Sequence, residues 1–335
     1  MRAVTLVEPG KTEVRDVEIP DAEKQGKALV RVHTAGLCGT DTSIVAGKMG
    51  VQFPRVMGHE AIGVVEAPGP RGLIKAGQRV LIDPAPCCEV CHVCRRGLRH
   101  ICPNGGLLGR DMDGVFSDYV SVDEKQLFVV PDSIGHKESG IIQVLGTCVH
   151  AVSKVSVRAG EVVVVIGLGV GGQLISQLLT KRGAKVIGVA RSAWKRDLAV
   201  ELGIHAAVAP AEIVDAVEEL SEGRGASLVV EAVGTEATFA QAIELAGFGA
   251  TVVLFGTATG GSEGLPYFQL YKKELTIQNP RAATAADYER AIALVAAGIV
   301  NGAPLVSASF NLSDAPEAFD AVTKSTTLKV LLDAT

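Results

Sequence analysis

The chain of 335 residues is long enough for two domains, and its content of 47% hydrophobic and 21% charged residues is typical of a globular protein with a substantial core. A net charge of −5 without a long run of one sign argues against a protein that binds nucleic acid or anionic membranes. The apolar run after Met1 is too short for a signal peptide, and no window reaches the roughly 18 apolar residues of a membrane helix, so we expect a cytoplasmic protein.

The first part of the chain, residues 1–145, consists of short apolar runs separated by glycine and proline, without regular intervening helices. This pattern predicts a mostly β domain. The expected strands are Ala3–Val7, Ala28–His33, Ala61–Glu66, Arg79–Asp83 and Gln126–Val130.

Four cysteines within residues 85–105 have the spacing of a metal site: Cys88, Cys91, Cys94 and Cys102. Thiolates are strong zinc ligands, and a shell of four sulfurs leaves no open position for chemistry, so the spacing predicts a structural zinc lobe. Cys87 adjoins the first ligand, but choosing Cys88 preserves the C-x-x-C-x-x-C spacing. The alternative is a set of buried or disulfide-paired cysteines.

The pattern changes to a helical period near residues 134–155, and from Glu161 apolar strands alternate with helices, so we assign residues 146–276 to a second domain. This alternation predicts a doubly wound parallel sheet with crossover helices, so the expected fold class is α/β plus β. After Thr276 the alternation stops, and a helix at Ala285–Ala297 with a final strand near Lys329–Leu332 leads us to assign residues 277–335 to the first domain. The expected strands of the second domain are Val162–Ile166, Lys185–Ala190, Leu228–Glu231 and Thr251–Phe255.

A glycine-rich turn with the pattern G-x-G-x-x-G follows the strand Val162–Ile166 and opens a helix. Gly167 allows the tight turn, Gly169 lets the backbone approach a pyrophosphate with Val170 beside it, and Gly172 lets the helix pack on the sheet. The amides at the helix start then meet the phosphate charge. The turn predicts a dinucleotide site, and the alternative is a purely structural tight turn.

The end of the next strand discriminates between the two nicotinamide cofactors. A site that prefers NAD usually carries Asp or Glu there to bind the ribose 2′-hydroxyl. This chain instead has Arg191, Ser192, Lys195 and Arg196, which are suited to a 2′-phosphate. We therefore expect NADP to be preferred over NAD, the alternative being charges that only solvate a helix start.

Two further motifs lie upstream, Gly36-Leu-Cys-Gly-Thr-Asp41 and Gly58-His-Glu60. Together with the cysteine lobe and the glycine turn, they make the chain resemble the zinc-dependent medium-chain alcohol dehydrogenase family over essentially its whole length. Within that family it is most similar to the polyol, threonine and sugar dehydrogenases. The resemblance implies a GroES-like β domain interrupted by a Rossmann domain, with the active site in the cleft between them.

The resemblance also implies a catalytic zinc bound by Cys38 and His59, with Glu60 as a direct ligand or a close neighbour. The family's further ligand position aligns with Gln143, and Cys148 is a rival. One thiolate with a neutral imidazole and a neutral amide leaves the ion with a net positive charge, so we expect Glu60 to bind zinc in at least one state of the cycle. With the cysteine lobe, about two zinc ions per chain are expected. The alternative for Cys38 and His59 is ordinary core residues.

By the same resemblance, zinc acts as a Lewis acid that lowers the pKa of the alcohol before hydride passes to the nicotinamide. Thr40 takes the position of the hydroxyl that relays the alcohol proton, and Ser43 stands where many members have a histidine. The expected substrate is a small secondary alcohol, polyol or sugar-like compound, or the matching carbonyl. Candidates for its pocket are Phe53, Leu107, Met112 and Phe116, with Asn279 or Arg281.

Three other functions are alternatives: a zinc-free quinone or enone reductase of the same superfamily, a biosynthetic carbonyl or iminium reductase, and a non-catalytic nicotinamide-binding sensor. Cys38, His59 and Glu60 argue against the zinc-free reductase, because that branch lacks these ligands. Members of the family form dimers and tetramers, so we expect a homodimer or homotetramer, in which the strand Thr251–Phe255 is a candidate for pairing across a two-fold axis.

Overall fold

The structure is a computed structural model that describes residues 1–335 apart from 258–263, 265, 325 and 335. The chain forms two compact units, the first made of residues 1–146 and 284–335 and the second of residues 147–283. The boundary at 283 lies beyond the expected 276, because strand β14 (Thr276–Gln278) still pairs with the sheet of the second unit. Within the described part of the chain, every helix is too short or too polar to span a bilayer.

The first unit is built around two sheets. Its strands are β1 (Arg2–Glu8), β2 (Lys11–Asp16), β3 (Ala28–Leu37), β4 (Arg55–Val56), β5 (Ala61–Ala67), β6 (Arg79–Ile82), β7 (Tyr119–Val122), β8 (Leu127–Val129), β15 (Val306–Asn311) and β16 (Lys329–Asp333). The larger sheet has seven strands in the order β15-β16-β3-β5-β6-β8, with β7 paired to β3, and the smaller has the order β2-β1-β4. The expected β domain is thus confirmed.

Short helices connect these strands. They are α1 (Gly39–Val45), α2 (His92–Arg95), α3 (His136–Ser139), α4 (Ile142–Ser153), α10 (Ala285–Ala296) and α11 (Ala315–Thr323), of which α4 continues into the second unit. Single turns of 3₁₀ helix occur at Arg99–Ile101, Glu124–Gln126, Ala303–Leu305 and Leu312–Asp314.

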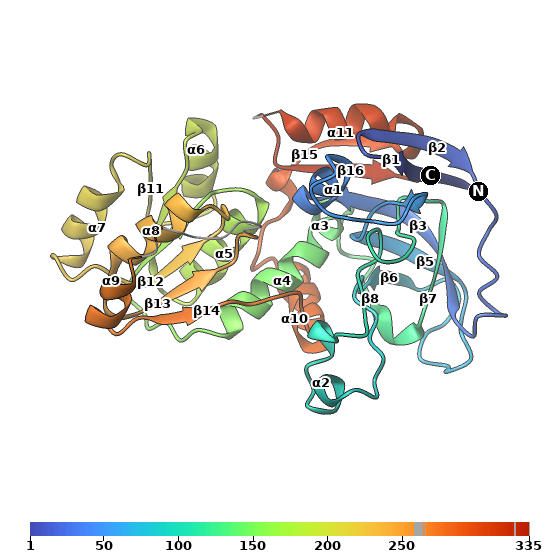
Figure 1. Ribbon diagram of the computed structural model, residues 1–335, viewed down its shortest axis with the longest axis horizontal. Coiled ribbons are helices and arrows are strands. Elements are labelled where there is room, and N and C mark those ends of the chain that lie inside the picture. Colours follow the sequence, from blue (N-terminus) through green and yellow to red (C-terminus); the bar gives the residue numbers. More distant parts are fainter. Residues whose placement is uncertain (258–263, 265, 325, 335) are drawn as a thin grey trace. The chain divides into compact units, whose positions relative to one another are not determined.

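Three strand ends converge in the larger sheet, and this convergence positions the site. Strand β5 runs antiparallel to β3, with Ala61 opposite Ala35. Strand β16 runs antiparallel to the other edge of β3, with Val330 opposite Leu37, so that the red β16 lies beside the blue β3 in Figure 1. The residues after β3, before β5 and at the start of β16 are therefore brought together from positions far apart in the sequence.

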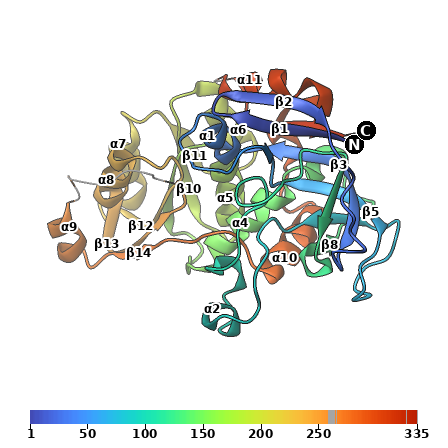
Figure 2. The same ribbon diagram turned by 45° about the vertical axis from the view of Figure 1, so that its right-hand side comes forward.

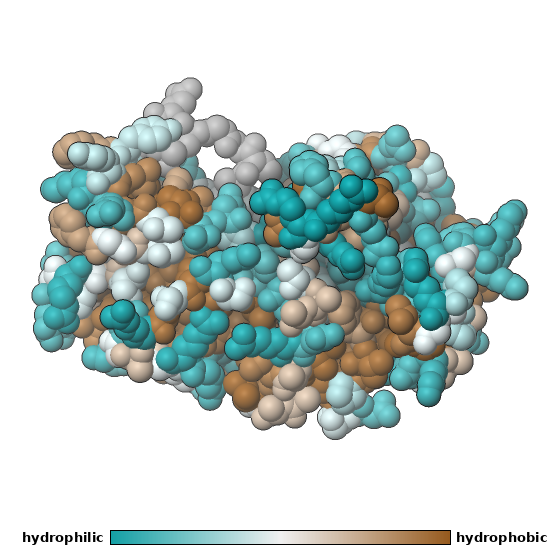
Figure 3. Space-filling view, turned by 90° about the horizontal axis from the view of Figure 1, so that it is seen from below, coloured by the Kyte–Doolittle hydropathy of each residue, from teal (hydrophilic) through white to brown (hydrophobic). Residues whose placement is uncertain are grey.

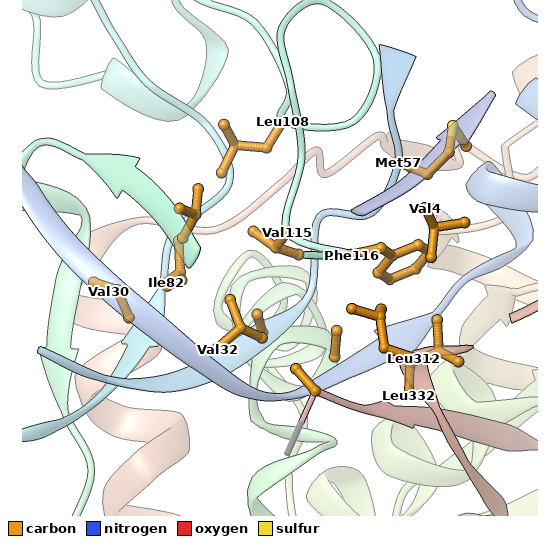
Figure 4. Packing of buried hydrophobic residues seen from close by; sticks show 14 of the residues in the cluster. Val4, Val30, Val32, Met57, Ile82, Leu108, Val115, Phe116, Leu312 and Leu332 are labelled. Atoms are coloured by element: carbon orange, nitrogen blue, oxygen red, sulfur yellow. The ribbon is translucent and has the colours of Figure 1, made fainter. Parts of the chain in front are cut away.

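The core of the first unit lies beneath this convergence. Figure 4 shows Val4, Met57, Leu312 and Leu332 around the ring of Phe116. Phe116 is fully buried and meets Phe319 edge-on, with ring centroids 6.3 Å apart. Phe116 therefore packs the core, and the sequence-based assignment of this residue to the substrate pocket was wrong.

The second unit contains a parallel six-stranded sheet in the order β11-β10-β9-β12-β13-β14. Its other strands are β9 (Val162–Ile166), β10 (Lys185–Val189), β11 (Ala206–Val208), β12 (Ala226–Glu231) and β13 (Ala246–Leu254). Every residue of β9 is buried, as expected for a parallel strand covered on both faces. Strand β13 contains the expected strand at 251–255 but lies between β12 and β14, so it has no free edge for pairing across a two-fold axis, whereas β14 lies at the edge of the sheet.

Helices cover both faces of this sheet, which confirms the Rossmann fold. They are α5 (Val170–Lys181), α6 (Ala193–Glu201), α7 (Ile213–Ser221), α8 (Glu236–Leu245) and α9 (Tyr267–Lys272). Figures 1 and 2 show α5 and α6 on one face and α7 and α8 on the other.

Candidate active site

A sulfur, an imidazole and a carboxylate meet where the three strand ends converge. Cys38 follows β3 directly, and His59 and Glu60 directly precede β5. One candidate ligand atom from each of the three side chains lies within 4.8 Å of the others. Donors about 2.0–2.3 Å from one tetrahedral zinc are about 3–4 Å apart, so this group has the size and chemistry of a zinc site.

Asp41 supports two of these side chains at once. It is fully buried, its Oδ2 accepts a hydrogen bond from the Cys38 amide at 2.9 Å, and its Oδ1 lies 3.3 Å from Nδ1 of His59. Burial alone would lower the pKa of His59, but the charge of Asp41 and hydrogen bonds with Asp41 and Cys38 raise that pKa well above its usual value. A carboxylate on one ring nitrogen orients the imidazole and leaves the other nitrogen for a metal.

Glu60 forms a buried ion pair with Lys329, the first residue of β16. Lys329 Nζ lies 2.7 Å from Oε2 of Glu60 and donates to the Leu37 carbonyl oxygen at 3.1 Å, and both side chains are at most 3% exposed. Burial acts to lower the pKa of Lys329, but the charges of Glu60 and Cys38 raise it above the usual value. A Cβ on Gly36 would lie 2.6 Å from Oε2 of Glu60, so the glycine makes room for the pair. Among the described residues, Oε1 of Glu60 has no hydrogen-bond partner.

Gln143 lies in the first turn of α4 and is buried beside this group. Together with Glu60 and Gly36 it lines a small hollow in the first unit. Its Nε2 donates to the hydroxyl oxygen of Tyr288 at 3.2 Å. Cys148, the rival of Gln143, belongs to the second unit, where its thiol donates to the Gly171 carbonyl oxygen at 3.6 Å.

The hydroxyls expected to relay a proton lie on α1. Thr40 is in the first turn of this helix and is partly exposed. Ser43 follows three residues later, which places both on one side of the helix.

The four cysteines of the lobe form a separate zinc site around α2, which projects from the first unit in Figure 1. The sulfur of Cys102 lies 3.5 Å from that of Cys88 and 3.9 Å from that of Cys91. Sulfurs bound to one tetrahedral zinc lie about 3.8 Å apart, and both of these distances are close to that value. Backbone hydrogen bonds from Cys91 and Val90 lower the pKa of Cys88 to about 6, so a thiolate is accessible at neutral pH. Cys87 is not part of this group of four, and all seven cysteines of the chain are free of disulfides.

The glycine turn of the second unit has the geometry of a nucleotide-binding loop. Gly167 has a φ of +97°, in the left-handed region that favours glycine, and Gly169 caps the start of α5, which begins at Val170. A Cβ on Gly172 would overlap the carbonyl oxygen of Gly167, whereas one on Gly169 would meet nothing within 4 Å. The helix start is therefore packed tightly on its inner side and open at Gly169, where a pyrophosphate needs access.

The basic residues after β10 have different surroundings. Arg196 donates from Nη1 to the carbonyl oxygens of Ala190 at 2.8 Å and Arg191 at 3.0 Å, so it holds the loop itself. Lys195 Nζ lies 5.2 Å from the centre of the Trp194 ring, and burial, with the charge of Arg191, lowers its pKa. Arg191 is exposed, and Ser192 is the N-cap of α6.

Sequence reasoning missed three residues at the first-unit site. Asp41 ends the motif Gly36–Asp41, and its spacing of three residues from Cys38 is that of a helix-capping pair, which is a sequence signal for its contact with the Cys38 amide. Lys329 is a single charge in an apolar strand, and Tyr288 is an aromatic residue in a helix, and neither pattern identifies a partner elsewhere in the chain.

Comparisons with known proteins add to this geometry. Residues 24–132 match the alcohol dehydrogenase GroES-like domain, and residues 169–297 match the zinc-binding dehydrogenase family. The chain is 30% identical over 304 residues to 2-dehydro-3-deoxy-L-galactonate 5-dehydrogenase of Pseudoalteromonas atlantica, covering 89% of this chain and 88% of the relative. It is 30% identical over 331 residues to the probable D-xylulose reductase A of Aspergillus clavatus, covering 95% and 92%. A crystal structure of a protein from Sinorhizobium meliloti, assigned as a zinc-binding dehydrogenase and bound to NADP, has a TM-score of 0.92 and 32% identity, covering 99% and 98%.

Proposed function

This chain belongs to the zinc-containing medium-chain alcohol dehydrogenase family, and from that premise we propose that it transfers a hydride between NADP and a secondary alcohol, polyol or sugar-like hydroxyl, or the matching ketone. It is a zinc-dependent dehydrogenase that uses NAD or NADP. The proposal is carried by the group of Cys38, His59 and Glu60, of which His59 and Glu60 are buried, and which is separate from the four-cysteine zinc site.

The proposed ligands of the catalytic zinc are Cys38, His59 and Gln143, with Glu60 joining in at least one state of the cycle. A zinc ion bound there supplies Lewis-acid polarisation of an alcohol or carbonyl oxygen. Asp41 orients the His59 ring, and Lys329 balances the charge of Glu60, for which a bound zinc would be a second cation. The free Oε1 of Glu60 supports this role, because a buried carboxylate oxygen without a partner is poised to accept one.

Thr40 is the proposed acceptor of the alcohol proton. Its hydroxyl lies two residues after Cys38 and at the partly exposed start of α1. Ser43 lies on the same side of the helix and is suited to pass the proton on, in place of the histidine found in many relatives.

NADP is the proposed cofactor, with the pyrophosphate at Gly167, Gly169, Val170 and Gly172. Arg191, Ser192 and Lys195 are the proposed contacts to the 2′-phosphate, and Arg196 holds their loop in place. The NADP bound to the Sinorhizobium meliloti protein supports this preference by similarity.

The proposed substrate class follows from two relatives. One is named as a dehydrogenase of a deoxy-galactonate and the other as a xylulose reductase. Both names describe a reaction at a hydroxyl or ketone group of a sugar derivative. We therefore place the substrate among secondary hydroxyls of small polyols and sugar acids. We propose the cytoplasm as the compartment, because a reducing environment maintains the thiolates of the two proposed zinc sites.

A homodimer or homotetramer is the proposed assembly. In the second unit, exposed aromatic side chains gather on and beside α9: Phe248, Tyr267, Phe268 and Tyr271 are 69–84% exposed. The Gly249 amide donates to the Lys273 carbonyl oxygen at 2.7 Å, which brings Phe248 to the end of α9. Hydrophobic patches between hydrophilic residues are visible on the face in Figure 3. Exposed apolar side chains gathered as on α9 mark interfaces between proteins. Light scattering at several protein concentrations tests whether a Tyr271→Lys variant yields monomers.

The proposed reaction is tested by a screen of secondary alcohols, polyols and sugar acids with NADP and NAD, following nicotinamide absorbance. We expect turnover with at least one polyol or sugar acid and a higher kcat/KM with NADP. The Cys38→Ser variant should lose turnover and still bind NADPH, as measured by fluorescence titration. Full activity of Cys38→Ser would refute the assignment of the catalytic metal.

A further inference from the structure

Tyr288 of α10 lies against Gln143 inside the first unit. It is 1% exposed, and its hydroxyl oxygen accepts the hydrogen bond from Nε2 of Gln143 at 3.2 Å. A hydrogen bond with Tyr288 also acts to lower the pKa of Asp83, which lies just after β6. The three side chains therefore form a chain of hydrogen bonds that ends at a proposed metal ligand.

The direction of these hydrogen bonds follows from the number of protons available. A tyrosine hydroxyl has one proton to donate, and above about pH 7, where the Asp83 carboxyl is ionised, its oxygens can only accept. Tyr288 therefore donates to Asp83 and has only acceptor capacity left for Gln143. Because Gln143 must donate to it, the amide nitrogen of Gln143 faces Tyr288, and its oxygen is at the opposite side of the amide.

The ring of Tyr288 is held where this geometry requires it. Gly146 lies three residues after Gln143 on α4, and a Cβ there would lie 2.5 Å from one ring carbon and 2.6 Å from another. The missing side chain thus lets the ring lie directly against the helix, on the face that carries Gln143. The ring also meets the ring of Phe128, with centroids 5.4 Å apart.

We propose that Tyr288 is a positioning residue for the metal centre, which fixes the Gln143 amide so that its oxygen is presented to the ion. Metals in proteins bind amides through oxygen, because the amide nitrogen carries protons and has no free lone pair. If the Gln143 amide were free to rotate, it would at times present its nitrogen to the ion in place of its oxygen. This inference rests on the proposed function, in which Gln143 is a zinc ligand.

The test compares Tyr288→Phe in two backgrounds, the natural Gln143 and a Gln143→Glu variant. A carboxylate presents oxygen in either orientation, so it has no need of the tyrosine hydroxyl. Two quantities are measured above pH 7, where Asp83 is ionised. They are the catalytic-site Co²⁺ affinity, by chelator competition with zinc kept in the cysteine lobe, and the visible d–d spectrum of that Co²⁺. We expect Tyr288→Phe to weaken Co²⁺ binding roughly 10- to 100-fold and to change the spectrum with Gln143. In the Gln143→Glu background the same substitution should change neither. An equal loss in both backgrounds, or none in either, would overturn the proposal.

A further variant separates failure of this inference from failure of the proposed ligand set. If Gln143→Met binds Co²⁺ as tightly as the natural protein, Gln143 is not a ligand, and both the ligand assignment and the inference fail. If Gln143→Met weakens Co²⁺ binding but Tyr288→Phe does not, the ligand assignment stands and the positioning role alone is overturned.

Two controls address folding. Tyr119→Phe removes a hydroxyl from β7 of the same unit, and its Co²⁺ affinity should equal that of the natural protein. If Tyr288→Phe does not fold, Asp83→Asn is measured in its place. An amide at position 83 can donate to Tyr288, so the Tyr288 hydroxyl can then donate to Gln143 and no longer fixes which amide atom of Gln143 faces it. Its Co²⁺ affinity should then fall more with Gln143 than with Glu at that position, and an equal fall would overturn the proposal.

Discussion

Replacing Lys329 with methionine removes the positive charge that pairs with Glu60 and retains most of the side chain's length. At 2.7 Å and an effective dielectric constant of about 20, the pair attracts by about 6 kcal/mol. Removing the lysine also removes its own desolvation cost, so about 3–5 kcal/mol of unfolding free energy should be lost. Without the lysine, Glu60 is a buried carboxylate with no compensating charge.

A zinc ion at Cys38 and His59 should reverse this effect, because it provides Glu60 with a new cation and is no longer repelled by Lys329. If the ion relieves about 3 kcal/mol of the loss, the Lys329→Met variant should bind zinc about a hundredfold more tightly than the natural protein. Urea unfolding of protein with zinc in the cysteine lobe, with and without the second zinc, gives the stability. Competition with a chromophoric chelator gives the affinity.

The control is the double variant Lys329→Met and Glu60→Gln, in which both charges are absent. Its stability without the second zinc should recover most of the loss, since replacing both partners of a buried pair is far less costly than replacing one. Weaker zinc binding by Lys329→Met, or an unchanged stability, would refute the exchange of Glu60 between lysine and metal.

Three further predictions concern other parts of the molecule. Cys88→Ser should reduce the zinc content by about one ion per chain and lower the melting temperature measured by calorimetry, because a structural zinc contributes folding energy directly; an unchanged zinc content would contradict the lobe assignment. Arg191→Ala should lower kcat/KM for NADP roughly 10- to 100-fold and leave NAD unaffected, since a charge-assisted hydrogen bond to phosphate is lost; equal losses with both cofactors would exclude a contact to the 2′-phosphate. Burial raises the pKa of Asp83 to about 7, so the folded protein retains this proton at a pH where the unfolded chain has released it. The unfolding free energy should therefore fall by about 2 kcal/mol from about pH 5 to about pH 7, and Asp83→Asn should flatten that slope in urea titrations; an equally steep slope in the variant would locate the titration elsewhere.

The fold could be predicted because its signals are local. Alternating apolar runs give the strands, and the glycine turn after Val162–Ile166 has the left-handed φ at Gly167 and the close packing at Gly172 that such a turn requires. The cysteine spacing alone placed four sulfurs around one point. Each of these patterns occupies a short stretch of chain, so sequence spacing and spatial distance are closely related.

Long-range contacts were beyond the reach of the sequence. Lys329 is 269 residues from Glu60, and only the register of β16 against β3 brings the two together. Tyr288 reaches Gln143 from a helix 145 residues away. Phe116 was assigned to the substrate pocket and lies in the core. A hydrophobic residue in the first domain suits either place, and only its packing against Phe319 decides between them. The pairing of β13 was misjudged for a similar reason, because β14 is too short to be recognised as the edge of the sheet.

The number of zinc ions per chain tests the central claim most directly. Elemental analysis of freshly purified protein, alongside protein quantitation, should give about two zinc ions per chain, one in the cysteine lobe and one at Cys38, His59 and Glu60. A value of about one that stays unchanged after zinc reloading, and that falls to zero in Cys88→Ser, would contradict a catalytic metal centre in this protein.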